Sequence, residues 1–315
     1  MTITQLKYVL AVAEHQNFTI ASEHCFVTQP TLSMQIQKLE EALETKIFNR
    51  NKKPIQLTEI GKKIVEQAKI IVDESNRITD IVDQQKGFIG GDFKLGIIPT
   101  IMPTLLPIFL KSFIKKYPKI NLKIEELTTE EIVKKLSDGH IDVAIAATPL
   151  ENENIKERVL YYEPFIGFVP TEHRLNSSKN LDVENLNIDD ILLLEDGHCF
   201  KDNILNLCST FGTKKQNFQL HSGSFNTLIK LSKEGLGMTL LPYLQTLDLN
   251  NEDKKFLKEF KAPAPAREVS IIYHKSHLKV HLIEALKNLI DGLIRGVIAF
   301  NNVKIISPIP QKKGV

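Results

Sequence analysis

The stretch "FVTQPTLSMQIQKLE", residues 26–40, decides how the first part of the chain folds. Leu32, Ile36 and Leu39 recur at helical spacing and form one apolar stripe, and Pro30 is tolerated in the first helical turn. The opposite face carries small hydroxyls, amides and a lysine, which are groups that meet base edges and phosphates in a major groove. We therefore predict a DNA-reading helix whose contacting residues are Gln29, Pro30, Thr31, Ser33, Gln35 and Lys38.

A basic hairpin follows this helix. "FNRNKKPIQLT", residues 48–58, sets Arg50, Lys52 and Lys53 beside a proline, and such a hairpin suits a wing on the phosphate backbone. Two shorter helical patterns come before the helix, so the predicted order of elements in residues 1–57 is helix, turn, helix and wing. This order favours a winged helix-turn-helix over the alternative, a small helical module whose polar face is only solvated.

Residues 58–87 form one long amphipathic pattern. Their apolar residues step by four and three alternately, which is the spacing of a coiled-coil seam with a serine in its middle. Pairing of two chains along that seam would set two DNA-reading modules side by side, so we expect a linker and dimerisation helix. The glycines of "KGFIGGD", residues 86–92, then predict a hinge. The seam residues are Ile64, Ala68, Ile71, Ser75, Ile78 and Val82.

Beyond the hinge, the apolar runs alternate between strand and helix spacing. This alternation predicts an α/β fold with parallel strands covered by helices, placed after a helix-rich N-terminal domain. We expect an effector domain over residues 88–300, made of two subdomains. The first takes residues 92–162 and 269–300, the second takes residues 163–268, and residues 301–315 are expected to be a mobile tail.

The composition limits the class of protein. The chain has 315 residues, of which 42% are hydrophobic and 25% are charged, enough for more than one core. Its net charge is +2, so any nucleic-acid contact must come from a local patch. The first residues lack the features of a secretory signal, and the apolar "LIDGLIRGVIAF" is too short to span a bilayer and contains Arg295. We expect a cytoplasmic protein that does not contact a membrane.

Two of the three cysteines, Cys199 and Cys208, lie nine positions apart in "EDGHCFKDNILNLC", residues 195–208. A reducing cytosol argues against a resting disulfide between them, while a transient, redox-sensing one stays open. If the segment is helical, the two Cα atoms lie about 13 Å apart along the axis, and a disulfide needs them within about 7 Å. Bond formation would then require the segment to unwind.

The start of this segment has the features of a reactive thiol site. Cys199 falls in the first turn of the predicted helix, with Asp196 as a candidate cap, and the amide dipoles and Lys201 would favour its thiolate. Cys208 could instead be a small buried hydrophobe. We assign Cys25 to that structural role because it lies among the packing residues of the N-terminal module.

Several separated motifs resemble those of LysR-type transcriptional regulators. "FTIASEHCFVTQPTLSMQIQKLEEAL" and "IFNRNKKPIQLTEIGK" resemble their winged helix-turn-helix, while "IEELTTEEIVKKLSDGHIDVAIA", "VPTEHRL" and "KEGLGMTLLP" resemble their effector domain. The resemblance implies a periplasmic-binding-protein-like effector domain of two α/β subdomains joined by crossing strands. It also implies double-stranded operator DNA and RNA polymerase as partners, and a dimer that assembles into a tetramer as a pair of dimers.

Within that family, "GIIPT", residues 96–100, and "LEDGHCFKDNILNLC", residues 194–208, resemble the members that sense hydrogen peroxide. The resemblance implies that Cys199 is the peroxidatic thiol and Cys208 the resolving one, with glutaredoxin or thioredoxin as the reductant and no cofactor. It implies a peroxide pocket formed by Thr100, Thr129, His198, Lys201, Asp202 and Arg267. The chain departs from the family pattern at Phe200, Lys201 and Asn203. At the position of Lys201 the family commonly has arginine, and lysine keeps the charge but lacks the planar fork of a guanidinium.

Three alternatives keep part of this account. A LysR-type regulator could bind a small organic effector between its subdomains, with the cysteines incidental. A thiol peroxidase with a DNA-binding appendage is disfavoured because the chain has no Cys-x-x-Cys pair, so we do not expect an enzyme. A metal sensor that uses Cys199, Cys208 and a histidine is disfavoured because no short-spaced ligand pair is present, so no metal is expected.

Overall fold

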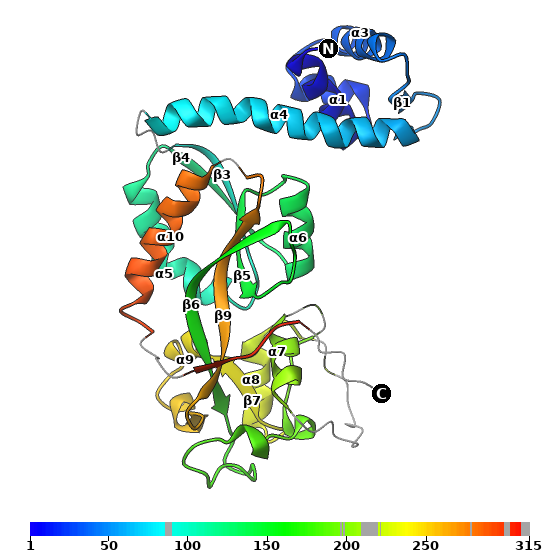
Figure 1. The fold of residues 1–315 in the computed structure, drawn as a ribbon. Coiled ribbons are helices and arrows are strands. Elements are labelled where there is room, and N and C mark those ends of the chain that lie inside the picture. The colour runs from blue at the N-terminus through cyan, green and yellow to red at the C-terminus, as the bar shows by residue number, and fades with distance from the viewer. Residues whose placement is uncertain are drawn as a thin grey trace. The chain divides into compact units, whose positions relative to one another are not determined.

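The computed structural model describes residues 1–85, 90–195, 197, 199–208, 220, 222–277, 279–298 and 303–309. The chain divides into two compact units, Met1–Phe88 and Ile89–Val315 (Figure 1). The first unit has one hydrophobic core and the second has two. Among the described residues, no helix combines the length and the apolar character needed to cross a membrane.

The first unit is a winged helix-turn-helix. Leu6, Val9, Leu32 and Ile36 meet in its core and none is more than 2% exposed, because each helix turns its apolar stripe inward. The two short strands pair antiparallel and form the predicted wing. The elements are α1 (Ile3–His15), α2 (Phe18–His24), α3 (Gln29–Ala42), β1 (Phe48–Asn49) and β2 (Gln56–Leu57).

Helix α4 (Glu59–Gln85) follows the wing, as the long amphipathic pattern predicts. Its first half packs against α1: Ala68 is buried, and Ile64 and Ile71 contact the same core. Ala68 therefore packs within its own unit, while Ile64 and Ile71 are only partly buried there, and their pairing with a second chain stays a prediction. Ile78 is 67% exposed and stays available for pairing. Two further predicted positions lie outside the described residues and side chains, the seam residue Val82 and the hinge residue Gly87.

The second unit is an α/β fold in which two long strands connect two subdomains. β3 pairs in parallel with both β4 and β5, while β9 is antiparallel to β5 and to β6. Both β6 and β9 continue into the second subdomain, where β6 pairs with β7 (Figure 1). The predicted fold class is confirmed, but the sheet is mixed and not wholly parallel, because the returning strand β9 enters it in the opposite direction. The elements are β3 (Gly91–Ile97), α5 (Met102–Lys116), β4 (Ile120–Glu126), α6 (Thr129–Ser137), β5 (Val143–Thr148), β6 (Ile155–Phe168), α7 (Cys199–Leu207), α8 (Phe225–Lys233), β7 (Thr239–Pro242), α9 (Tyr243–Leu247), β8 (Leu257–Lys258), β9 (Ala264–His274), α10 (Val280–Ile294) and β10 (Val303–Ile305), with three short 3-10 turns (Val183–Asn185, Ile188–Asp190 and Asp253–Phe256).

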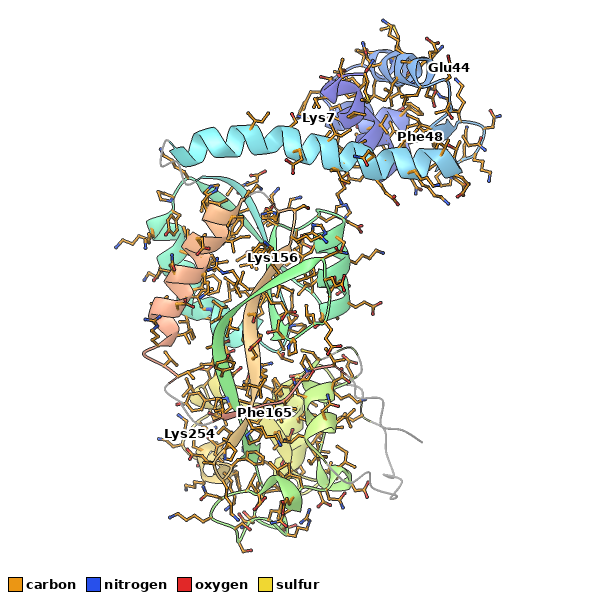
Figure 2. The ribbon with its side chains drawn as sticks, in the orientation of Figure 1. Lys7, Glu44, Phe48, Lys156, Phe165 and Lys254 are labelled. Carbon is orange, nitrogen blue, oxygen red and sulfur yellow. The ribbon has the colours of Figure 1, made fainter. Side chains whose placement is uncertain are left out.

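The two subdomains of this unit have separate hydrophobic cores. The first core gathers around Phe93, Phe109 and the fully buried strand β5. The second includes Phe165, which β6 carries into the second subdomain (Figure 2). Cys199 belongs to the first core and Cys208 to the second. The two thiols of interest are therefore held by different packing environments although one short helix connects them.

Part of the predicted tail is an ordered strand. β10 pairs in parallel with β9, with Val303 opposite Ala264, and Ile306 is only 7% exposed. The prediction of a mobile tail is wrong for residues 303–309, because the edge of β9 offers unpaired backbone groups and Ile306 supplies apolar surface to bury. Residues 301–302 and 310–315 lie outside the described part of the chain.

Candidate functional site

Helix α7 separates the two cysteines. It begins at Cys199, and the backbone N–H of Cys208 donates to the carbonyl of Ile204 at 3.1 Å, so Cys208 continues the last turn. Their exposed fractions are 8% and 2%. A helical rise over nine residues puts the two Cα atoms about 13 Å apart, well beyond the roughly 7 Å limit of a disulfide. The prediction that a helix holds the thiols apart is confirmed.

Aromatic packing anchors α7 in the second subdomain. Phe200 makes edge-to-face contacts with Phe165 and Phe225, with ring centroids 5.2 and 5.1 Å apart. Such pairs contribute about 1 kcal/mol each beyond their buried area. Phe200, one of the departures from the family pattern, is therefore a core residue that binds the start of α7 to the second subdomain.

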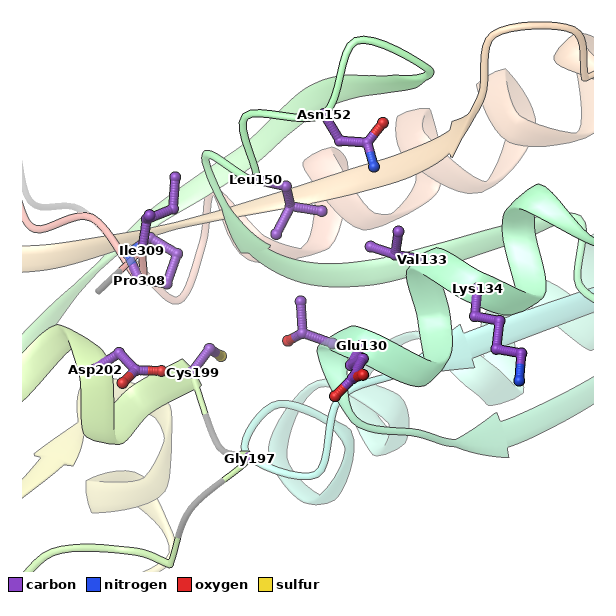
Figure 3. A pocket seen from close by; sticks show the side chains of 11 residues that line it. Glu130, Val133, Lys134, Leu150, Asn152, Gly197, Cys199, Asp202, Pro308 and Ile309 are labelled. Atoms are coloured by element: carbon purple, nitrogen blue, oxygen red, sulfur yellow. The ribbon is translucent and has the colours of Figure 1, made fainter. Parts of the chain in front are cut away.

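A cavity of about 530 Å³ opens where α7 faces α6. Figure 3 shows Cys199 and Asp202 on α7, with Glu130 and Val133 across the space from them. Cys199 and Asp202 share one face of the helix because they are three positions apart. Thr129, Cys199 and Asp202 are thus the predicted pocket residues that the fold brings together. The full lining is Thr129, Glu130, Val133, Lys134, Leu150, Asn152, Gly197, Cys199, Asp202, Pro308 and Ile309.

Thr129 is the first residue of α6, where capping positions it. The hydroxyl of Thr128 accepts a hydrogen bond from the backbone of Glu131, and the Glu131 carboxylate accepts one in return. Thr129 Oγ1 is buried and has no hydrogen-bond partner among the described residues. It nevertheless lies near enough to Cys199 to lower the pKa of the thiol. A hydroxyl in that position can bond to a thiolate or to a small polar ligand in the cavity.

Burial raises the pKa of the Cys199 thiol above its ordinary value and outweighs the nearby Arg267 guanidinium and the Thr129 hydroxyl, which lower it. The carboxylate of Asp202 raises it further. The helix start acts as expected, because a hydrogen bond from the backbone of Phe200 lowers the pKa of Cys199, but burial outweighs it and the net shift is opposite to the expected one. The acting cation is Arg267, and Lys201 does not line the cavity because two helical steps turn it about 200° from Cys199.

Arg267 lies at the centre of a buried polar cluster. Its Nε and Nη2 donate to Glu163 Oε2 at 2.9 and 2.7 Å. Its Nη1 and Nη2 donate to the hydroxyl and carbonyl of Thr100, at 2.9 and 3.0 Å. The guanidinium also lies 5.4 Å from the ring centroid of Phe200. Thr100 and Arg267 are not among the residues that line the cavity. They form a buried cluster whose guanidinium acts on the Cys199 thiol, and their part in a peroxide pocket stays a prediction.

Glu163 is a buried residue of this cluster that was not predicted. An acidic residue within the apolar strand "YYEPFIGF" was a signal that could have revealed it. The predicted pocket residue His198 and the candidate cap Asp196 lie outside the described residues. Among the residues that are described, His, Cys, Asp and Glu side chains do not gather in a group of three that could hold a metal ion.

The predicted DNA-reading residues are of two kinds. Gln29, Pro30, Thr31 and Lys38 on α3 are exposed, as are Lys52 and Lys53 on the wing. The others form hydrogen bonds within their own unit: Gln35 accepts one from Gln5 at 3.2 Å. Arg50 donates to Ser33 at 3.1 Å and pairs with the buried Glu40 at 3.2 Å. Arg50 thus ties the wing to α3.

The chain matches two family descriptions. "Bacterial regulatory helix-turn-helix protein, lysR family" covers residues 3–62, and "LysR substrate binding domain" covers residues 86–293. The chain therefore belongs to the LysR family. It is a DNA-binding transcriptional regulator and not an enzyme.

Its relatives include proteins named "Hydrogen peroxide-inducible genes activator". The DNA-binding transcriptional dual regulator OxyR of Escherichia coli (strain K12) is 30% identical over 296 residues, 93% of this chain and 97% of that protein. The HTH-type transcriptional regulator EstR of Acinetobacter baylyi is 32% identical over 277 residues, 87% of this chain and 91% of that protein. The structure of a full-length OxyR variant from Pseudomonas aeruginosa has a TM-score of 0.75 and 33% identity, and covers 92% of this chain and 94% of that one.

Proposed function

We propose that this regulator senses hydrogen peroxide by oxidation of Cys199 and formation of a disulfide with Cys208. The observation that carries the proposal is the pair of buried cysteines at the two ends of α7, the first of which opens onto a cavity with polar groups. Similarity to OxyR proteins over nearly the whole chain supports it. The disulfide would convert a local covalent event into a change of protein conformation.

The chemistry needs two steps at Cys199. Its thiolate attacks one oxygen of the peroxide, the O–O bond breaks, and the proton of the thiol goes to the leaving oxygen, which gives a sulfenic acid and water. The sulfur of Cys208 then attacks the sulfur of Cys199 and releases a second water. The two thiols lose two electrons and the peroxide gains them. Arg267 would favour the thiolate, and the hydroxyl of Thr129 would hydrogen bond the leaving oxygen.

Disulfide formation would require α7 to refold. Phe200 and Cys208 pack in the second core, while Cys199 packs in the first, so the sulfurs meet only if part of the helix unwinds. Refolding would change the surface of the second subdomain and the packing between subunits, and thereby the spacing of the DNA-reading modules. We propose a dimer paired through α4, further assembled as a pair of dimers.

The remaining partners follow from the same proposal. The regulator would bind double-stranded operator DNA and contact RNA polymerase in the cytoplasm. A thiol reductant such as glutaredoxin or thioredoxin would reduce the disulfide and reset the sensor.

A second candidate function is sensing of a small organic effector under reducing conditions. The cavity of about 530 Å³ exceeds what a peroxide fills, and Lys134 and Asn152 add polar groups to apolar walls from Val133 and Leu150. The similarity to EstR is as high as that to OxyR. Metabolites that change DNA affinity of the Cys199→Ser, Cys208→Ser double variant would favour this function.

Limited proteolysis tests the main proposal. Sites within α7, residues 200–207, should be cut faster after treatment with a small dose of peroxide, because an unwound segment reaches the protease site and a helix does not. The increase should vanish in Cys199→Ser and in Cys208→Ser. Equal cleavage of the native protein before and after oxidation would count against the proposal.

A further inference from the structure

Residues 303–309, which we call the strap, connect β9 to the helix that carries Cys199. The backbone N–H of Ile306 donates to the carbonyl of Ala266 at 2.8 Å, directly after β10. Ile306 is buried in the second core. The strap therefore continues along the edge of β9 toward α7 and does not extend into solvent.

Two asparagines of α7 bind the strap. Asn203 Nδ2 donates to the carbonyl of Ile306 at 2.7 Å. Asn206 Nδ2 donates to the carbonyls of Ser307 and Ile309, at 2.8 and 2.7 Å. Positions 199, 203 and 206 recur at helical spacing and share one face. The strap is thus tied to the same face of α7 that presents the Cys199 sulfur.

The end of the strap forms one wall of the cavity. Pro308 and Ile309 line it together with Cys199 and Asp202, and Figure 3 shows both strap residues beside the start of α7. Both side chains are apolar and offer no hydrogen bond to an oxidant. Their effect on a ligand is therefore steric: they limit the size of what reaches the sulfur.

We propose that the strap is a specificity determinant for the Cys199 site. Pro308 and Ile309 restrict access to small reagents, and Asn206 is a positioning residue that holds them in place. If the regulator senses peroxide as proposed above, this restriction selects hydrogen peroxide over bulky hydroperoxides, and that part of the inference rests on the proposed function. The steric restriction itself does not, because Pro308 and Ile309 line the cavity beside Cys199 whichever reagent enters it.

The experiment compares alkylation of reduced full-length protein by small iodoacetamide and by bulky N-phenylmaleimide, with Cys199 and Cys208 peptides quantified separately by mass spectrometry. Ile309→Ala and Asn206→Ala should speed the reaction of Cys199 with the maleimide by about fivefold or more, the order expected when contacts that hold a segment are lost. The rate with iodoacetamide should change far less. Ile305→Ala, an exposed strap residue outside the cavity lining, is the matched control and should change neither rate.

Cys208 at the far end of α7 reports whether the helix as a whole has opened. If its alkylation accelerates in parallel with that of Cys199, the variants loosen α7 and the strap proposal is overturned. Unchanged maleimide rates in both variants would overturn it too.

A second arm replaces the alkylating reagents with hydrogen peroxide and cumene hydroperoxide. The rate of Cys199 oxidation by the bulky hydroperoxide, relative to hydrogen peroxide, should rise in Ile309→Ala. If no form of the protein reacts with either peroxide while the alkylation pattern holds, the proposed function fails and the steric role of the strap stands.

Discussion

Glu163 and Arg267 lie opposite each other on β6 and β9, and two hydrogen bonds of 2.9 and 2.7 Å join the guanidinium to one carboxylate oxygen. Both residues are fully buried. The pair lies at the point where the two long strands pass between the subdomains, and it brings the positive charge that favours the Cys199 thiolate. The architecture that joins the subdomains therefore also sets the electrostatics of the candidate redox site.

Removing one member of this pair should destabilise the protein strongly. Arg267→Met leaves the Glu163 carboxylate buried without its counter-charge, and such losses cost about 3–5 kcal/mol of unfolding free energy. Adding Glu163→Gln to Arg267→Met should restore part of the loss, because the uncompensated charge is gone. Urea unfolding of the two variants measures both effects. Lys261→Met, at an exposed ion pair with Asp182, is the control and should change stability much less. Native stability of Arg267→Met would contradict this account.

The reactivity of Cys199 should increase with pH. Burial is the main cause that holds its pKa above the ordinary value, so the thiolate is the minor form at neutral pH. Its fraction, and with it the rate of reaction with peroxide or iodoacetamide, should rise about tenfold per pH unit from pH 6 to 8. Rates measured on the Cys199 peptide across this range give the profile. A plateau reached below pH 7 would show that the thiolate is already the dominant form and would contradict the prediction.

The wing lysines should contribute to DNA affinity without reading sequence. Lys52→Ala and Lys53→Ala each remove an exposed positive charge from the wing. Each should weaken binding to all sequences alike and reduce the slope of log affinity against log salt by about 1. Titration of DNA selected from a random library, at several salt concentrations, measures the slope. Lys255→Ala, exposed in the other unit, should leave it unchanged.

The exposed amide of Gln29 should act differently from the wing. Gln29→Ala removes a side chain that can pair with a base edge, at a cost of about 1–3 kcal/mol for the preferred base only. Selection of DNA by this variant should return a relaxed preference at one position of each half-site. Retention of the wild-type preference would remove Gln29 from the reading surface.

Local patterns made the N-terminal unit predictable. The stripe of Leu32, Ile36 and Leu39 and the basic hairpin after it depend on residues close in sequence, and each forms the expected element. The helix that starts at Cys199 was predicted for the same reason. Neighbouring residues determine periodicity and capping, so sequence alone carries this information.

Features that depend on distant residues were not predictable. Glu163 and Arg267 are 104 positions apart and meet only because β6 and β9 pair in one register. The bonds of Asn203 and Asn206 to the strap likewise span about a third of the chain, 103 positions for Asn203. The direction of the Cys199 pKa shift was predicted wrongly because it depends on burial, which only the tertiary packing determines.

The most direct test of the redox account is mass spectrometry of alkylated peptides after brief exposure to sub-stoichiometric hydrogen peroxide. The native protein should show a rapid Cys199–Cys208 linkage, and the Cys208→Ser variant should show a trapped sulfenic acid on Cys199. The Cys199→Ser variant should show neither. If both thiols of the native protein remain open to alkylation after unfolding at that dose, peroxide sensing by this pair is contradicted.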